Sequence, residues 1–106
     1  MKPADILAVD LGATYGWCYG PDNIVHGFDR LPTDVSNGRA YCLFCDGMVR
    51  LLNKRRPELI AVEQPFINYK KQQPQQVRRW YAFVSMLEMV AVRFGLPIKE
   101  YAPSTI

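Results

Sequence analysis

Two acidic residues each end a short apolar run, and this pattern constrains the fold more than any other feature of the chain. Asp10 follows the run 6–9, and Glu63 follows the run 59–62. Runs of aliphatic residues of this length are typical of buried strands. A carboxylate at such a position is costly to bury unless a cation pairs with it. The two acids therefore predict one metal site assembled from distant parts of the chain. The alternative is that each acid caps a turn at the end of its strand.

The composition fits a small globular domain. The chain has 106 residues, of which 49% are hydrophobic, and a formal net charge of +3. This length and apolar content suit one domain with a single core. No apolar run approaches the roughly 20 residues that a membrane helix needs, and residues 1–5 lack the apolar stretch of a secretory signal. We therefore expect a cytoplasmic protein that does not contact a membrane.

Apolar periodicity and turn residues predict a β-β-β-α-β-α-β order of elements. The short connections between the first three strands imply antiparallel neighbours, and the helical crossover places the fourth strand parallel to the first. If these two strands are neighbours, they lie about 4.8 Å apart, and Asp10 and Glu63 project from the same carboxyl edge. The predicted strands are 5–10, 14–20, 24–29, 58–63 and 97–101, and the predicted helices run from the cap Ser36 to Arg56 and from Pro74 to Phe94.

The cysteine and histidine residues do not form a recognisable ligand set. Cys18, Cys42 and Cys45 make an odd number, which argues against a disulfide framework. Cys42 and Cys45 have the C-x-x-C spacing of redox and zinc sites, but no second such pair or suitably spaced histidine accompanies them. Because both lie in a predicted helix, we interpret them as structural thiols. The lone His26 lies in a predicted strand, and we interpret it as solvent-facing or packed rather than as a ligand.

Three segments of the chain resemble the Holliday-junction resolvases of the RuvC type. These segments are 6–12, 61–66 and 99–104, and they occur in the order and at spacing similar to that of the family. The resemblance covers essentially the whole chain. It implies an α/β, ribonuclease-H-like fold in a single domain, 1–106. In this fold a five-stranded mixed sheet has the order 3-2-1-4-5, with strands numbered along the chain, and helices pack on it.

The resemblance also implies an activity. Asp10 and Glu63 match the first two catalytic carboxylates of the family, so both are predicted catalytic residues and metal ligands. The implied enzyme is a Mg²⁺-dependent crossover junction endodeoxyribonuclease that resolves four-way DNA junctions, with Mn²⁺ as an alternative ion. The family completes its site with aspartates on a later helix, for which Glu88 and Glu100 are not obvious substitutes. We therefore expect a protein truncated at its C-terminus that binds metal poorly and cleaves slowly or not at all.

A basic stretch follows the second acid. Between Gln64 and Leu87 the sequence has four basic residues, interleaved aromatic residues and no acidic residue. This composition is typical of a surface that binds a phosphate backbone, although an ordinary solvated loop and helix start would also have it. Phe66 either stacks on a base or packs under the loop. The predicted DNA-binding residues are Gln64, Phe66, Tyr69, Lys70, Lys71, Arg78 and Arg79.

The second predicted helix is apolar nearly all round, so the face that does not pack on the sheet needs cover. A homodimer would supply this cover. The resemblance implies a homodimer as well, because a four-way junction needs two cuts related by a two-fold axis. The alternative cover is the missing C-terminal segment. The predicted interface residues are Trp80, Phe83, Leu87 and Val90.

Two other functions are compatible with parts of the sequence. Residues 10–16 also resemble the phosphate loop of the actin, sugar-kinase and heat-shock chaperone superfamily, which binds ATP on a related sheet. That function requires a second half-domain and an adenosine loop, which the sequence lacks. A non-catalytic DNA-binding module is the third possibility. The segment 63–66 and the basic stretch favour nucleic acid, so we expect branched double-stranded DNA as the partner and no organic cofactor.

Overall fold

The computed structural model describes residues 4–11, 14–21, 24–63 and 74–101, and five strands and two helices lie in these ranges. Each element lies within about two residues of its predicted position, and the predicted order of elements is confirmed. The strands are β1 (Ile6–Asp10), β2 (Thr14–Gly20), β3 (Val25–Arg30), β4 (Leu59–Glu63) and β5 (Ile98–Tyr101), and the helices are α1 (Asn37–Lys54) and α2 (Pro74–Arg93).

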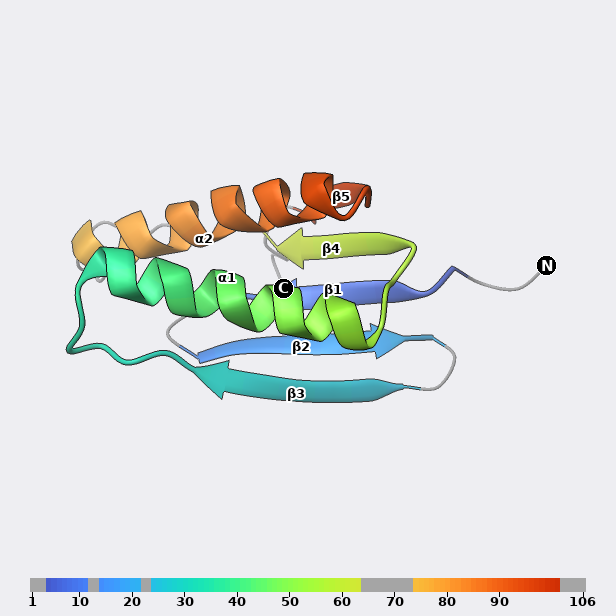
Figure 1. Cartoon of the computed structure of the whole chain (residues 1–106), viewed down its shortest axis with the longest axis horizontal. Helices are drawn as coiled ribbons and strands as arrows, with labels where there is room; N and C mark the ends of the chain where they lie inside the picture. The colour runs from blue at the N-terminus through green and yellow to red at the C-terminus, as the bar shows by residue number, and fades with distance from the viewer. Residues whose placement is uncertain (1–3, 12–13, 22–23, 64–73, 102–106) are drawn as a thin grey trace, which may run out of the picture.

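The strands form one mixed sheet in the order β3-β2-β1-β4-β5 (Figure 1). The first three strands are antiparallel neighbours, whereas β4 runs parallel to both β1 and β5. The predicted order 3-2-1-4-5 and the predicted adjacency of β1 and β4 are therefore confirmed. Because β1 and β4 are parallel, their carboxyl ends lie at the same edge of the sheet.

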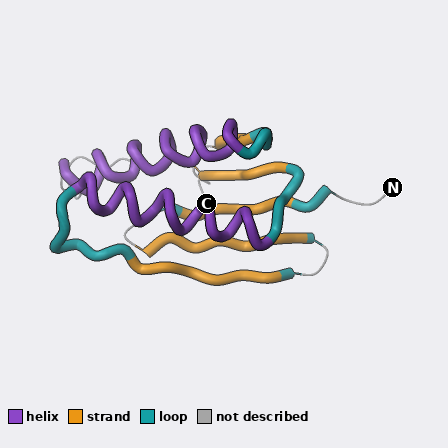
Figure 2. The backbone as a smooth tube through the Cα atoms, viewed as in Figure 1, coloured by secondary structure: helices purple, strands orange, loops and turns teal. Residues whose placement is uncertain are grey.

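Both helices lie on the same side of the sheet, as Figures 1 and 2 show. Side chains alternate across each strand, so Leu7 and Val9 of β1 face the helices while Ala8 and Asp10 face away. The same alternation holds in β4. The helix-covered face and the inner faces of the helices make one core, formed by Leu7, Val9, Tyr15, Tyr19, Leu31, Phe44, Met48, Leu52, Ile60, Val62, Phe83, Leu87, Val90 and Ala91.

The ends of the helices carry the caps that the sequence predicts. Ser36 is the N-cap of α1, where its hydroxyl oxygen accepts a hydrogen bond of 3.1 Å from the backbone N–H of Arg39. Gly95 follows α2 with φ +67°, and the Leu96 N–H donates to the carbonyl of Ala91 at 2.9 Å. This pattern is a Schellman motif, which favours glycine because of the left-handed φ. Neither helix of the described ranges combines the length and apolar character needed to cross a membrane.

The amino end of the sheet is tied to the end of α1 by a buried tyrosine. The Tyr19 hydroxyl donates to the carbonyl oxygens of Leu51, at 3.2 Å, and of Arg55, at 2.7 Å. Burial is the main reason that the pKa of Tyr19 rises to about 12. The Arg55 guanidinium lies 4.8 Å from the centre of the Tyr19 ring and makes a two-pronged ion pair with Asp5, at 2.6 and 3.0 Å. This end of the sheet is therefore held by side-chain contacts.

Candidate functional site

The two predicted acids are neighbours in the structure. Val9 of β1 pairs with Val62 of β4 in the parallel ladder, so the next residues, Asp10 and Glu63, end adjacent strands side by side. Neighbouring strands are about 4.8 Å apart. Both side chains are exposed, and neither forms a hydrogen bond or an ion pair with a described residue. Two carboxylates at the ends of neighbouring strands repel each other unless a cation lies between them, and they provide hard oxygen ligands for a divalent cation.

The acids lie on the face of the sheet that no described helix covers. This face contains an open depression of about 650 Å³. Small side chains line its centre and leave this space open: Ala8 of β1 pairs with Cys18 of β2 on one side and with Ala61 of β4 on the other. Its lining includes Asp10, Cys18, His26, Ala61, Glu63 and Tyr101. The depression therefore reaches from the paired acids towards the middle of the sheet.

Tyr101 is a site residue that the sequence analysis did not assign. The ladder between β4 and β5 pairs it with Glu63, which brings it to the rim of the depression. Its ring is 46% exposed and lies 5.6 Å from the Lys99 ammonium. Residues 99–104 belong to one of the segments that resemble the resolvases, but only the register of β5 against β4 shows that Tyr101 lies beside an acid.

The other acids of the second half of the chain lie elsewhere. Glu100 pairs with Val62, so it faces the helix side of the sheet rather than the depression. There it contacts Glu88 of α2, and a hydrogen bond between the two carboxyl groups raises the pKa of Glu88. Glu88 and Glu100 therefore do not lie beside Asp10 and Glu63. This position agrees with the expectation that they are not substitutes for the later aspartates of the resolvases. In the described ranges no three acidic, cysteine or histidine side chains cluster as a metal-binding group.

Of the predicted DNA-binding residues, the structure describes two. Arg78 and Arg79 lie in the first turns of α2, which begins at the same edge of the sheet as the paired acids. The Arg78 side chain is exposed, whereas the Arg79 side chain is half-buried and contacts the connection between β3 and α1. The remaining predicted residues lie outside the described ranges: Gln64, Phe66, Tyr69, Lys70 and Lys71.

The predicted dimer interface needs correction. Phe83, Leu87 and Val90 are at most 4% exposed and belong to the core, and Trp80 is half-buried against it. Periodicity showed that α2 has two apolar faces, but it did not show which of them meets the sheet. The face that remains exposed carries Tyr81, Ser85, Met89 and Val92. The four predicted interface residues are therefore residues of the inner face.

The cysteines and the histidine have no described metal-binding partner set. Cys18 is exposed on β2, and Cys42 and Cys45 are free cysteines on α1, of which Cys42 is exposed and Cys45 is half-buried. Burial raises the pKa of the Cys45 thiol, which makes its reactive thiolate less populated. His26 is exposed on β3 and lines the depression beside Cys18, its partner in the antiparallel ladder.

The fold and the paired acids define a class of protein. A five-stranded mixed sheet in the order 3-2-1-4-5, with two helices packed on it, is the ribonuclease-H-like fold. T. thermophilus RuvC in complex with a Holliday junction substrate superposes with a TM-score of 0.81 at 15% identity, over 95% of this chain and 66% of that chain. The yeast mitochondrial Holliday junction resolvase Ydc2 superposes with a TM-score of 0.71 at 18% identity, over 94% of this chain and 51% of that chain.

Within that class, the sequence similarity is to RuvC. The chain is 30% identical to the crossover junction endodeoxyribonuclease RuvC of Methylobacterium radiotolerans over 116 aligned positions, which cover 99% of this chain and 53% of that protein. No protein-family model matches the chain. The resemblance to RuvC-type resolvases is therefore confirmed. The chain spans about half the length of this curated relative.

Proposed function

We propose that the chain is the part of a metal-dependent, structure-specific DNA endonuclease that carries the first two catalytic acids, and that its substrate is a four-way DNA junction. The observation that supports this most is the adjacency of Asp10 and Glu63 at the carboxyl edge of β1 and β4. The similarity to RuvC supports the same function.

The described residues provide two carboxylate ligands for a hard divalent cation. Asp10 and Glu63 would hold it through carboxylate oxygens, which Mg²⁺ and Mn²⁺ both accept. Bound there, such an ion supplies charge neutralisation and an activated water at a phosphodiester. The chain itself contributes a fixed spacing, because both acids end strands of one ladder, and an open face that a DNA backbone can approach. We propose Mg²⁺ as the ion, with Mn²⁺ as the alternative.

The test uses a labelled four-way junction, with binding measured in EDTA and cleavage measured in Mg²⁺ or Mn²⁺, for this chain and for its full-length parent protein. Asp10→Asn and Glu63→Gln each keep the shape of the side chain and remove its charge. We expect each to lower cleavage by the parent by about 100-fold or more while junction binding stays within about threefold.

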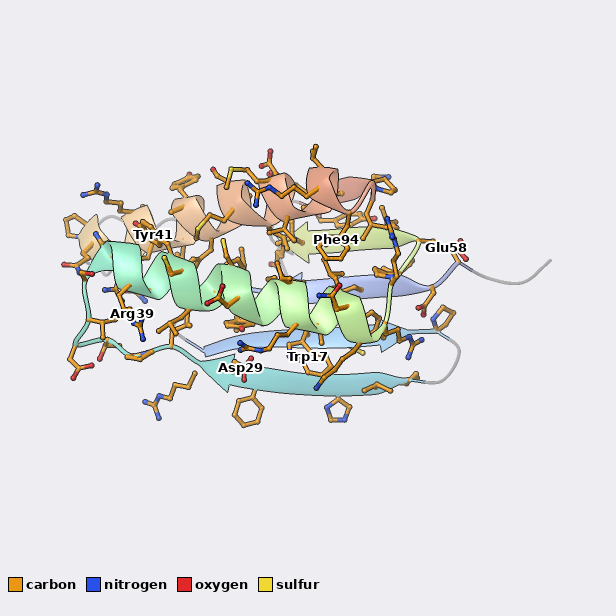
Figure 3. The ribbon with its side chains drawn as sticks, viewed as in Figure 1. Trp17, Asp29, Arg39, Tyr41, Glu58 and Phe94 are labelled. Atoms are coloured by element: carbon orange, nitrogen blue, oxygen red, sulfur yellow. The ribbon has the colours of Figure 1, made fainter. Side chains whose placement is uncertain are left out.

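Glu58→Gln is the matched control, because Glu58 is also exposed but precedes β4 at the opposite end of the sheet (Figure 3). It should leave both cleavage and binding unchanged. Equal loss of binding and cleavage in the Asp10 and Glu63 variants would show that these acids are structural, and would contradict the proposal.

A non-catalytic DNA-binding module of the same fold is the second candidate. Its support is that the described ranges hold two acids at this edge and no third acid, cysteine or histidine beside them. This candidate predicts that the parent protein binds the junction and does not cleave it in either metal. Cleavage that disappears in Asp10→Asn would exclude it.

We also propose that the protein acts as a homodimer built on the exposed face of α2. Tyr81, Met89 and Val92 are 53%, 53% and 77% exposed, which is unusual for large apolar side chains on one helix face. A second copy would cover them, and two-fold symmetry suits a four-way junction. Sedimentation equilibrium should give a dimer for the unsubstituted chain and a monomer for Val92→Asp. A monomer in both cases would contradict this arrangement.

A further inference from the structure

Arg78 and Arg79 are adjacent in the sequence and differ completely in their surroundings. The Arg78 side chain is exposed and makes no hydrogen bond or ion pair with any described residue. The Arg79 side chain is half-buried and donates three hydrogen bonds within the chain. Sequence alone gives both the same role, because a basic pair at the start of a helix suits a phosphate backbone equally well at either position.

The Arg79 guanidinium reaches from α2 to the connection between β3 and α1. Its Nε donates to the Asn37 side-chain oxygen at 2.8 Å, and its Nη2 donates to the Val35 carbonyl oxygen at 2.7 Å. A longer contact of 3.5 Å joins Nη1 to the Pro32 carbonyl oxygen. The Nε and Nη2 edge is the one that binds a phosphate or carboxylate in two-pronged fashion. In Arg79 this edge is already occupied by acceptors of the protein.

These contacts join three elements at the edge of the sheet that carries the paired acids. Asn37 is the first residue of α1, directly after the N-cap Ser36. Its side-chain oxygen also accepts a hydrogen bond of 3.3 Å from Gln75, one turn before Arg79 on α2. Figure 1 shows the first turns of both helices side by side at this edge. The connection between β3 and α1, the first residue of α1 and the first turns of α2 are therefore held together.

None of these contacts pairs the charge of Arg79 with an anionic group. All three acceptors are neutral oxygens, so a lysine would keep the charge and lose the planar fork that meets three acceptors at once. The basic side chain that the same turn of α2 exposes to solvent is that of Arg78. Holding the turn fixed spares the cost of ordering it when DNA binds.

We infer that Arg79 is a positioning residue, which fixes the first turns of α2 against the cap of α1 so that Arg78 contacts the DNA backbone. This inference rests on the proposed function, because it assumes that this edge of the sheet binds DNA. Under this inference Arg78 contacts phosphate and Arg79 does not, so the two arginines have separate roles.

The test measures binding of the chain to a fluorescently labelled four-way junction in EDTA, over a series of salt concentrations and well below the thermal midpoint. Arg79→Lys should weaken binding by about three- to tenfold, because the turn must then be ordered on binding, and the slope of affinity against salt should stay the same. Arg78→Gln should lower that slope by about one and leave the thermal midpoint unchanged. Arg78→Lys should resemble the unsubstituted chain in both measurements.

Two further variants separate positioning from simple loss of stability. Asn37→Ala removes the acceptor that Arg79 and Gln75 share, so it should weaken junction binding as Arg79→Lys does. The double variant should bind the junction no more weakly than either single variant. Ile60→Val lowers stability in the core and should lower the thermal midpoint without changing affinity.

Three results would overturn the inference. Arg79→Lys could bind as tightly as the unsubstituted chain although its thermal midpoint falls, which would make the role purely structural. Arg79→Gln could lower the salt slope by about one with an unchanged midpoint, which would make Arg79 a phosphate contact. An unsubstituted chain that does not bind the junction would overturn the proposed function, and the inference with it.

Discussion

The two faces of the sheet differ residue by residue along the same strands. On the helix-covered face, Leu7, Val9, Ile60 and Val62 are at most 3% exposed. On the opposite face, the residues between them are small or charged, and two carboxylates stand side by side at the end of β1 and β4. One face is close-packed and apolar, whereas the other is open and places two like charges side by side at one edge.

The helix-covered face stabilises the fold, whereas the open face carries the candidate functional site. A close-packed face loses free energy of unfolding with almost any change of volume or hydrogen bonding. A pair of exposed like charges contributes no favourable energy in the absence of a cation, so substitution there should not lower stability. Small, isosteric substitutions should therefore have opposite effects on the free energy of unfolding when they are made on the two faces.

The largest effect is expected where α1 packs on the sheet. A Cβ atom at Gly47 would clash with the Tyr15 hydroxyl group. The Tyr15 O–H donates a hydrogen bond of 3.0 Å to an Asp29 carboxylate oxygen. Burial, together with this hydrogen bond, raises the pKa of Tyr15 far above its usual range, so the hydroxyl stays protonated. Gly47→Ala should therefore lower the free energy of unfolding by about 2 kcal/mol, as overpacking does. Urea denaturation followed by circular dichroism measures this change.

Gly38→Ala is the matched control on the same helix, because a methyl group added there would have no atom within 4 Å and the residue is exposed. Removing a glycine there should raise stability by about 0.4–1 kcal/mol. If both variants changed stability in the same direction and by the same amount, the close packing of α1 over Tyr15 would be refuted.

A smaller loss is expected at the amino end of the helix-covered face. Tyr19→Phe removes the hydroxyl that donates to the carbonyl oxygens of Leu51 and Arg55. The free energy of unfolding should fall by about 1–1.5 kcal/mol, since buried hydrogen bonds are lost and nothing replaces them. Tyr81→Phe, on the exposed face of α2, should change it by less than about 0.5 kcal/mol. Equal effects of the two substitutions in a denaturation experiment would argue against the Tyr19 contacts.

The smallest effect is expected at the edge strand β5, where Glu100 faces Glu88 of α2. The pKa of Glu88 is raised, so the folded state holds this proton more tightly than the unfolded state does. The pair therefore favours folding at acidic pH, below the ordinary glutamate pKa, and this contribution is lost as the pH rises through the raised value. Because both side chains are exposed, the change is a few tenths of a kcal/mol.

Glu88→Gln removes the charge from this pair. Its stability relative to the unsubstituted chain should increase from pH 4 to pH 7, which thermal unfolding at several pH values can follow. A constant difference over this range would show that the two carboxyl groups do not interact.

Much of the fold could be predicted from the sequence because local and global signals agree. The aliphatic runs, the cap Ser36 and the stop at Gly95 each have a local physical cause, and the structure places every element within about two residues of its prediction. The adjacency of Asp10 and Glu63 followed from the crossover rule together with the resemblance to resolvases. The pairing of β1 with β4 brings Asp10 and Glu63, which are distant in the sequence, to one edge of the sheet.

The errors and omissions concern side chains whose surroundings depend on tertiary packing. Periodicity could not decide which apolar face of α2 meets the sheet, so Phe83, Leu87 and Val90 were assigned to an interface although they lie in the core. The register of β5 was needed to bring Tyr101 beside Glu63. Arg78 and Arg79 have the same local sequence signal, and only the contacts of Arg79 with Asn37, Val35 and Pro32 show that their surroundings differ.

The central claim is that the paired acids on the open face bind a divalent cation. The most direct measurement is the thermal midpoint of this chain in EDTA and in rising Mg²⁺ or Mn²⁺, compared with Asp10→Asn, Glu63→Gln and the control Glu58→Gln. In EDTA the two site variants should be at least as stable as the unsubstituted chain, because each removes one of two like charges that end neighbouring strands.

At a cation concentration about ten times the dissociation constant, the unsubstituted chain and Glu58→Gln should gain about 1.4 kcal/mol of stability. The two site variants should gain much less. An unsubstituted chain whose midpoint does not respond to either cation, or site variants that respond as it does, would contradict the claim that Asp10 and Glu63 form a metal site.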